Sequence, residues 1–85
     1  MKIAGRIIQN RNIKQNTADD FEATYKGHII SITTDHGFGE PEYEHLKRFN
    51  IDVYELNTGS YAVDTWKDCH TIKDAIRYAL EGACL

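Results

Sequence analysis

The sequence predicts an α+β domain in which an antiparallel sheet of about four to five strands packs against a C-terminal amphipathic helix. Three observations support this fold class. Apolar residues recur with helical spacing near the C-terminus, apolar and polar residues alternate over several shorter segments, and turn-forming sequences separate those segments. A chain of 85 residues is the size of one small domain, so we expect a single domain across residues 1–85 with a thin core.

The N-terminal segment 2–9 contains three isoleucines and predicts a first strand, although Gly5 and the adjacent Ile7 and Ile8 disturb its alternation. Residues 10–16 are polar and rich in turn-forming side chains, which predicts a loop or the frayed end of a strand. The sheet is therefore expected to begin with one strand followed by an irregular connection.

A hairpin is expected next. Residues 21–25 alternate apolar and polar side chains, Lys26 and Gly27 can form a tight turn, and residues 28–34 return with β-branched side chains. This gives the second and third strands of the sheet.

A second hairpin repeats the pattern further along the chain. Residues 51–56 and 61–66 alternate on either side of the turn-forming segment 57–60. Together with the first strand, the two hairpins account for about five strands.

A short helix is predicted near residues 41–49, between the two hairpins. Pro41 stands at its head, acidic residues come first, and basic residues come last, as the helix dipole favours. An irregular excursion is the competing interpretation of this segment.

The last element is the most clearly defined. Thr71 can accept a hydrogen bond from the first turn, Asp74 faces the positive end of the helix, and Gly82 stands where a left-handed terminator is expected. Apolar residues share one stripe of this helix: Ile72, Ala75, Ile76, Ala79, Leu80 and Ala83.

The sequence contains no arrangement of residues that is typical of a catalytic site or of a metal site. Cys69 and His70 are adjacent, so their side chains point apart. Cys69 and Cys84 are separated by a helix of about 20 Å, so they cannot form a disulfide with each other. Residues 35–45 hold two imidazoles and four carboxylates, but no recognised ligand spacing. We therefore expect neither an enzyme nor a metal or cofactor site.

Charge is unevenly distributed along the chain. Residues 1–16 contain four basic residues and no acidic one, namely Lys2, Arg6, Arg11 and Lys14, whereas residues 17–85 contain six basic and thirteen acidic residues. This argues against a broad nucleic-acid-binding surface, which needs basic residues spread over one face. An acidic surface that docks on a basic protein partner is expected instead.

The candidate partner-binding residues combine carboxylates with two large aromatic side chains. Phe38 lies between two glycines, a format that can present a bulky anchor, although packing over the core edge is the alternative. Trp66 ends a predicted strand and is expected to be partly exposed. The full set is Asp35, Phe38, Glu40, Glu42, Glu44 and Trp66.

The C-terminal third, a strand followed by a helix, resembles the C-terminal part of many small accessory proteins from phages and mobile elements, including anti-CRISPR inhibitors. The resemblance is one of architecture and size, and it rests on Ser60-Tyr61-Ala62-Val63-Asp64-Thr65-Trp66 followed by Thr71-Ile72-Lys73-Asp74-Ala75-Ile76. It implies a stoichiometric inhibitor that occupies a basic, nucleic-acid-binding surface of a nuclease effector complex. The same strand-then-helix ending is similar to that of antitoxins whose strand ends in Pro-Asp-x-Pro-Gly-Cys. The corresponding segment here, Trp66-Lys67-Asp68-Cys69, keeps only the aspartate and the cysteine of that motif.

The sequence therefore predicts a non-enzymatic protein-binding module, with direct nucleic-acid binding and membrane insertion not expected. The alternative is a nucleic-acid-binding or antitoxin-like regulatory module that uses the basic N-terminal segment. A homodimer stays open. No apolar run suggests a secretion signal or a membrane span, so a cytoplasmic location is expected.

Overall fold

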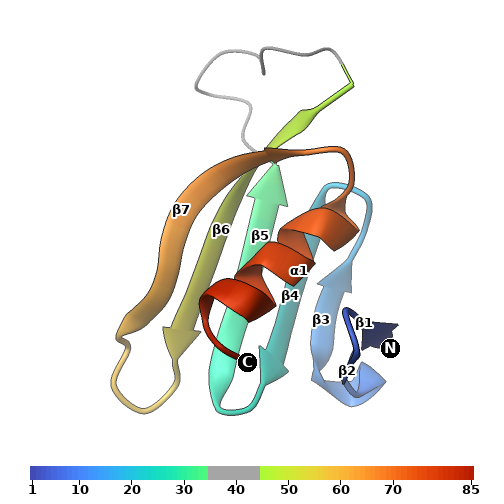
Figure 1. Cartoon of the computed structure of the whole chain (residues 1–85). Coiled ribbons are helices and arrows are strands. Elements are labelled where there is room, and N and C mark those ends of the chain that lie inside the picture. The colour runs from blue at the N-terminus through green and yellow to red at the C-terminus, as the bar shows by residue number, and fades with distance from the viewer. Residues whose placement is uncertain (35–44) are drawn as a thin grey trace.

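The computed structural model describes residues 1–34 and 45–85 and has the predicted α+β architecture (Figure 1). Five antiparallel strands form one sheet in which the order in space follows the order in the chain. A separate two-stranded hairpin, a 3-10 turn and one helix complete the described part. The elements are β1 (Lys2–Ile3), β2 (Arg6–Ile7), η1 (Asn10–Asn12), β3 (Ile13–Asn16), β4 (Asp20–Tyr25), β5 (His28–Thr34), β6 (Lys47–Glu55), β7 (Tyr61–Cys69) and α1 (Ile72–Gly82).

The N-terminal segment differs from the prediction of one continuous strand over residues 2–9. The chain turns at Ala4 and Gly5, so β1 and β2 pair with each other and not with the main sheet. The polar stretch that follows forms η1 and then β3, which pairs with β4 as the first strand of the sheet. The five strands of the main sheet are thus not the five that the sequence predicts.

The first predicted hairpin is confirmed. Tyr25 pairs with His28, which leaves Lys26 and Gly27 as a two-residue loop. Both loop residues have positive φ, +47° and +73°, as a type I′ turn requires. This turn fixes the register between β4 and β5, so that Ala23 faces Ile30 and Phe21 faces Ile32.

The short helix predicted near 41–49 is wrong for its described residues, because residues 45 and 46 are not helical and Lys47–Phe49 begin β6. Phe49, Ile51 and Val53 are completely buried and alternate with partly exposed side chains, so the period is that of a strand. Residues 41–44 of that prediction lie outside the described part of the chain.

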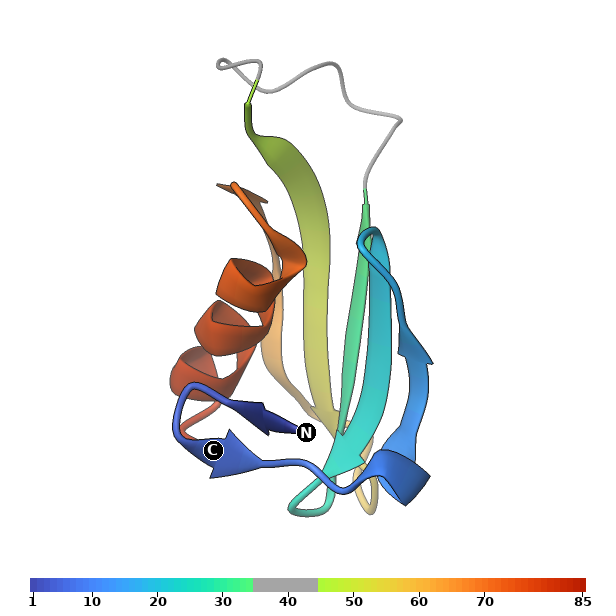
Figure 2. The same ribbon diagram turned by 90° about the vertical axis from the view of Figure 1, so that its right-hand side faces the viewer.

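One face of the sheet carries the core. Helix α1 and the β1–β2 hairpin lie on the same side of the sheet, and α1 contacts β4 through β7 as well as β1 (Figures 1 and 2). The inward side chains of the strands meet the apolar stripe of α1. The buried residues are Ile3, Ile8, Phe21, Ala23, Ile30, Ile32, Phe49, Ile51, Val53, Val63, Cys69, Ala75, Ile76, Ala79 and Leu80.

The start of α1 is as predicted, whereas its end is not. The backbone N–H of Asp74 donates to Thr71 Oγ1 at 3.4 Å, so Thr71 is the N-cap. Gly82 is still helical, and an added Cβ there would lie 3.1 Å from Val63 Cγ2. Cys84 takes the left-handed conformation instead, with φ +58°. In the described ranges, no helix has the length and apolar character needed to cross a bilayer.

Candidate functional site

Five of the six predicted partner-binding residues lie outside the described part of the chain: Asp35, Phe38, Glu40, Glu42 and Glu44. The sixth, Trp66, lies in β7, and 57 % of its surface is exposed. The surroundings of Trp66 are therefore the part of the predicted site whose geometry is defined.

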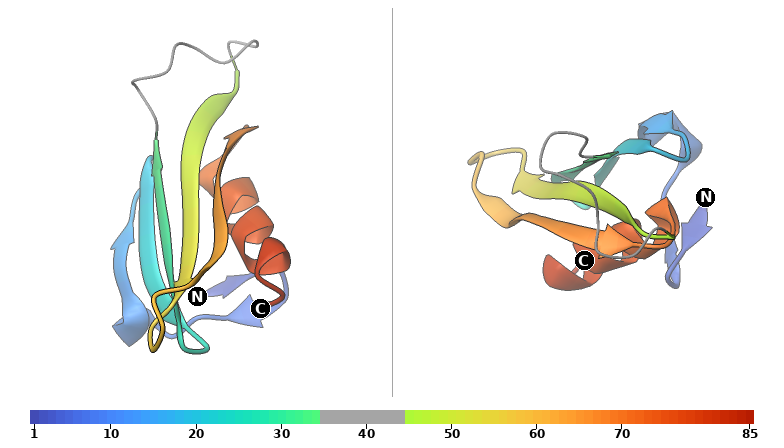
Figure 3. Two further views of the ribbon diagram at one scale, coloured as in Figure 1. Left: turned by 90° about the vertical axis from the view of Figure 1, so that its left-hand side faces the viewer. Right: turned by 90° about the horizontal axis from the view of Figure 1, so that it is seen from above.

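Trp66 belongs to the face of the sheet opposite α1, which we call the open face. Among the described residues, no helix or strand covers it (Figures 2 and 3). Because successive side chains of a strand point to opposite faces, the buried positions 49, 51 and 53 of β6 place the even-numbered ones outward. The outward residues of β6 and β7 are Arg48, Asn50, Asp52, Tyr54, Tyr61, Ala62, Asp64, Trp66 and Asp68.

The Arg48 guanidinium group packs against the Trp66 ring. The guanidinium carbon of Arg48 lies 4.5 Å from the ring centroid, within the range of a cation–π contact. Arg48 Nε donates to Asp68 Oδ1 at 3.0 Å, and its Nη2 donates to Asp68 Oδ2 at 3.3 Å. This two-point contact fixes the guanidinium plane, so Trp66 is presented in one orientation while much of its surface faces solvent.

Two aspartates face each other beside Trp66. Asp52 of β6 is directly opposite Asp64 of β7. Burial raises the pKa of the Asp52 carboxyl, and a hydrogen bond with Asp64 and repulsion from its charge raise that pKa further. No basic side chain within residues 1–34 and 45–85 forms an ion pair with either carboxyl group. The pair therefore concentrates negative charge that the described protein leaves without a counter-ion.

A tyrosine pair lies on the other side of the aspartates. Tyr54 and Tyr61 face each other next to a register irregularity in the β6–β7 ladder, and their ring centroids are 5.5 Å apart. Tyr61 is 59 % exposed. The carboxyl pair is thus flanked along the strands by aromatic rings, with Trp66 on one side and the tyrosines on the other.

The open face as a whole is acidic. Among the described residues, five acidic side chains project from it against two basic ones, and both basic groups have an acidic neighbour. Lys14 Nζ lies 3.9 Å from Glu22 Oε2, and Arg48 is held by Asp68. The five acidic residues are Asp20, Glu22, Asp52, Asp64 and Asp68.

Two of the four basic N-terminal residues, Arg6 and Lys14, have side-chain contacts on different elements of the structure. Arg6 Nη1 donates to the carbonyl oxygen of Ala4 at 2.6 Å, within its own hairpin. Lys14 lies on the open face of the sheet beside Glu22. Arg6 and Lys14 therefore do not contribute to one contact set for a phosphate backbone.

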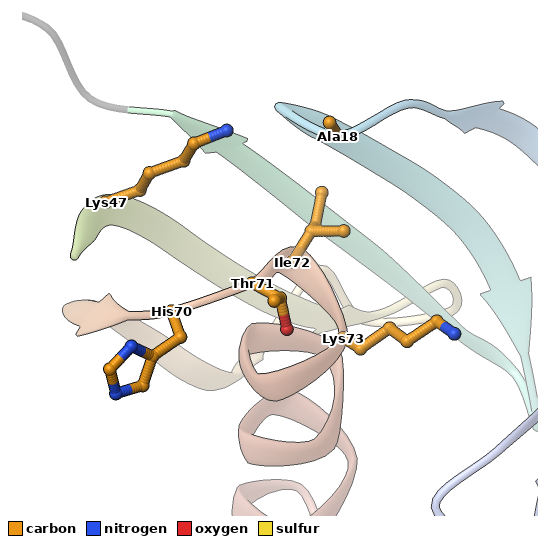
Figure 4. A pocket seen from close by; sticks show the side chains of 6 residues that line it. All are labelled: Ala18, Lys47, His70, Thr71, Ile72 and Lys73. Carbon is orange, nitrogen blue, oxygen red and sulfur yellow. The ribbon is translucent and has the colours of Figure 1, made fainter. Parts of the chain in front are cut away.

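A shallow pocket of about 340 Å³ lies at the start of α1. Its basic side chains do not converge: the amino groups of Lys47 and Lys73 lie on opposite sides of Ile72, and His70 points away from Ile72 (Figure 4). Lys47 Nζ already pairs with Asp19 Oδ1 at 3.0 Å. The pocket therefore offers no converging set of polar groups.

The neighbouring thiol is held in its neutral form. Cys69 is buried, and burial, followed by repulsion from Asp74, raises the pKa of its thiol. Its neighbour in sequence, His70, stacks on His45 with the ring centroids 4.8 Å apart. Within residues 1–34 and 45–85, no three potential metal ligands come together.

Sequence reasoning missed the residues around Trp66, chiefly Arg48, Asp52, Asp64 and Asp68. Alternation was the available signal, because extending the strand of Ile51 and Val53 backwards to Phe49 places Arg48 outward. Assigning residues 41–49 to a helix concealed it. The cross-strand partners also depend on register, which no single strand specifies.

Comparisons with protein-family models, with curated proteins and with solved structures found no match.

Proposed function

We propose that this chain is a non-enzymatic protein-binding module that docks the open face of its sheet on a basic surface of a partner protein. The observation that carries the proposal is the exposed Trp66 ring, fixed by Arg48 and placed beside the Asp52–Asp64 pair, which has no basic partner in residues 1–34 and 45–85. Aromatic side chains of this kind dominate binding energy at protein interfaces, and the acidic surroundings favour a cationic partner.

The geometry supports docking because the anchor needs little ordering when a partner binds. Arg48 and Asp68 already restrict the Trp66 ring, so less side-chain entropy is lost on association. The surrounding carboxylates speed the encounter with a basic surface and set its orientation.

An inhibitory role follows if the partner uses its basic surface to hold nucleic acid. The open face would then compete with phosphates for the same Lys and Arg side chains, one protein molecule for each partner molecule. This is the anti-CRISPR-like form of the proposal, with a nuclease effector complex as partner. A cytoplasmic location belongs to the same proposal, since both cysteines are free thiols.

The test begins with capture of partners from a host lysate by the tagged wild-type protein. Trp66→Ala and Asp64→Lys are expected to weaken capture by about tenfold or more, because each removes a central contact or inserts a repulsive charge. Matched controls are Tyr78→Ala, which removes a partly exposed aromatic ring of α1, and Glu81→Lys, which makes the same charge change on the helix.

Binding should also weaken as salt concentration rises. Equal capture by wild type, W66A and D64K would contradict docking through the open face. A low-salt gel shift separates the nucleic-acid-binding alternative, because binding of DNA or RNA by the wild-type protein alone would favour that function.

A further inference from the structure

We propose that the partner contributes an extended basic segment that pairs along the free edge of β7 as a sixth strand of the sheet. This inference rests on the proposed function and specifies the mode of docking. The segment would carry Lys or Arg opposite Asp64, on the same side as the Trp66 ring.

Strand β7 is a suitable template because it is a long edge. It runs for nine residues and pairs with β6 on one side, and no segment of the described chain pairs with its other side (Figure 1). The opposite edge, β3, has four residues and a register irregularity. An unpaired edge presents backbone N–H and C=O groups that an extended peptide can satisfy.

The side chains of β7 specify what kind of strand fits. A neighbouring strand places its side chains about 4.5 to 5.5 Å from those directly opposite. A Lys or Arg opposite Asp64 would thus provide the counter-ion that the Asp52–Asp64 pair lacks among the described residues. Alternate residues of the same segment would face Trp66 and Asp68, which continue the outward row.

A second copy of this chain fits the edge less well. Two β7 strands paired along their length would bring Asp64 and Asp68 of both copies onto one face of a continuous sheet, where like charges repel. The lysine of β7 does not offset this, because Lys67 lies on the helix side with its Nζ 4.9 Å from the Tyr78 ring centroid. The edge therefore favours a basic segment over self-association.

The test compares two synthetic probes. One is an eight-residue peptide that alternates Arg and Thr, and the other is the same peptide methylated on every backbone nitrogen, which keeps its charge but donates no backbone hydrogen bond. Fluorescence of Trp66, the single tryptophan, reports binding of each. We expect the methylated peptide to bind at least about tenfold more weakly, since several hydrogen bonds to the edge are lost.

Amide hydrogen exchange locates the bound peptide. The unmethylated probe should slow exchange of alternate β7 amides in the wild-type protein and in E81K, but much less in D64K. Equal binding of both peptides without protection of β7, or protection of β3 instead, would overturn strand addition and leave open-face docking standing.

Two further outcomes separate the proposals. Absence of binding by either peptide at low salt would count against both the strand and the acidic docking face. A concentration-dependent dimer of the free protein with protected β7 amides would show that a second copy occupies the edge, and this inference would fail.

Discussion

Cys84, which follows the C-cap residue of α1, has a left-handed backbone conformation that glycine usually adopts. The N–H of Leu85 donates to the Leu80 carbonyl at 2.8 Å, and the N–H of Cys84 donates to the Glu81 carbonyl at 3.1 Å, so the helix closes with a Schellman motif. Its left-handed residue is Cys84, where a Cβ is unfavourable by about 1 to 2 kcal/mol.

Cys84→Gly is therefore expected to raise the free energy of unfolding by roughly 0.5 to 1 kcal/mol, after the added flexibility of the unfolded chain is subtracted. Urea denaturation of the two proteins measures the difference. Cys84→Ala serves as the control, because it removes the thiol and keeps the Cβ. If Ala stabilises as much as Gly, the backbone conformation is not the cause.

Asp52 links stability to pH. Its raised pKa means that the folded state binds this proton more tightly than the unfolded state does. The contribution of Asp52 to stability is therefore greatest below the unfolded-state pKa, about 3.9, and is lost as pH rises through the raised folded-state value.

Asp52→Asn is expected to stabilise the protein at pH 7 by roughly 0.2 to 1 kcal/mol, because the amide removes one of two facing negative charges. The advantage over wild type should shrink on acidification to about pH 3, which is below the unfolded-state pKa of about 3.9, so that the aspartate is protonated in both states. Unfolding curves over this pH range test the sign. Glu81→Gln, on α1, controls for the change in net charge, and an advantage for D52N that grows on acidification would refute the assignment.

A helix or hairpin could be predicted from its local sequence where capping or turn-forming residues identify its ends. Helix α1 could be predicted because Thr71 and the apolar stripe lie within one segment, and the Lys26-Gly27 turn marked its hairpin equally well. The first part of β6 could not, since Lys47 and Arg48 matched a helix C-terminus locally, while Phe49 is buried in the core that the sheet shares with α1.

The candidate site was accessible to sequence reasoning only in part. Partial exposure of Trp66 was predicted because the strand was expected to end there, whereas β7 continues to Cys69 and Trp66 is exposed because it lies on the open face. Its contact with Arg48, and the pairing of Asp52 with Asp64, depend on the β6–β7 register, which includes an irregularity between Val53 and Tyr54. A shift by one residue would send these side chains to the other face, so no motif along the chain could identify them.

The N-cap of α1 provides a test at the scale of the element. Thr71→Ala removes the side-chain oxygen that accepts the Asp74 N–H, and it should lower the free energy of unfolding by about 1 kcal/mol. Thermal unfolding followed by circular dichroism measures the loss. Thr71→Ser retains the oxygen and should stay close to wild type, whereas equal destabilisation by both variants would assign the effect to the lost methyl group.

The molecule as a whole depends on one thin core between the sheet and α1. Phe49 belongs to that core and is completely buried. Phe49→Ala is expected to cost about 3 to 5 kcal/mol, a large share of the total stability of a small domain.

The denaturant midpoint of F49A should accordingly be much lower than that of wild type. Phe49→Leu keeps most of the apolar volume, so its free energy of unfolding should fall far less. As a comparison, Trp66→Ala removes a larger ring from the open face and should leave the midpoint nearly unchanged. A midpoint for F49A close to that of wild type would mean that β6 does not pack as described.

The order of strands in the main sheet has a kinetic consequence. Every β-ladder joins segments that are consecutive in the chain, from β3 through to β7, and α1 then packs back across them. Contact order is correspondingly low for a β-rich protein, because few closures between distant residues must precede the first native pairings. We expect single-exponential refolding on the order of milliseconds, with hairpins able to nucleate independently before the helix docks.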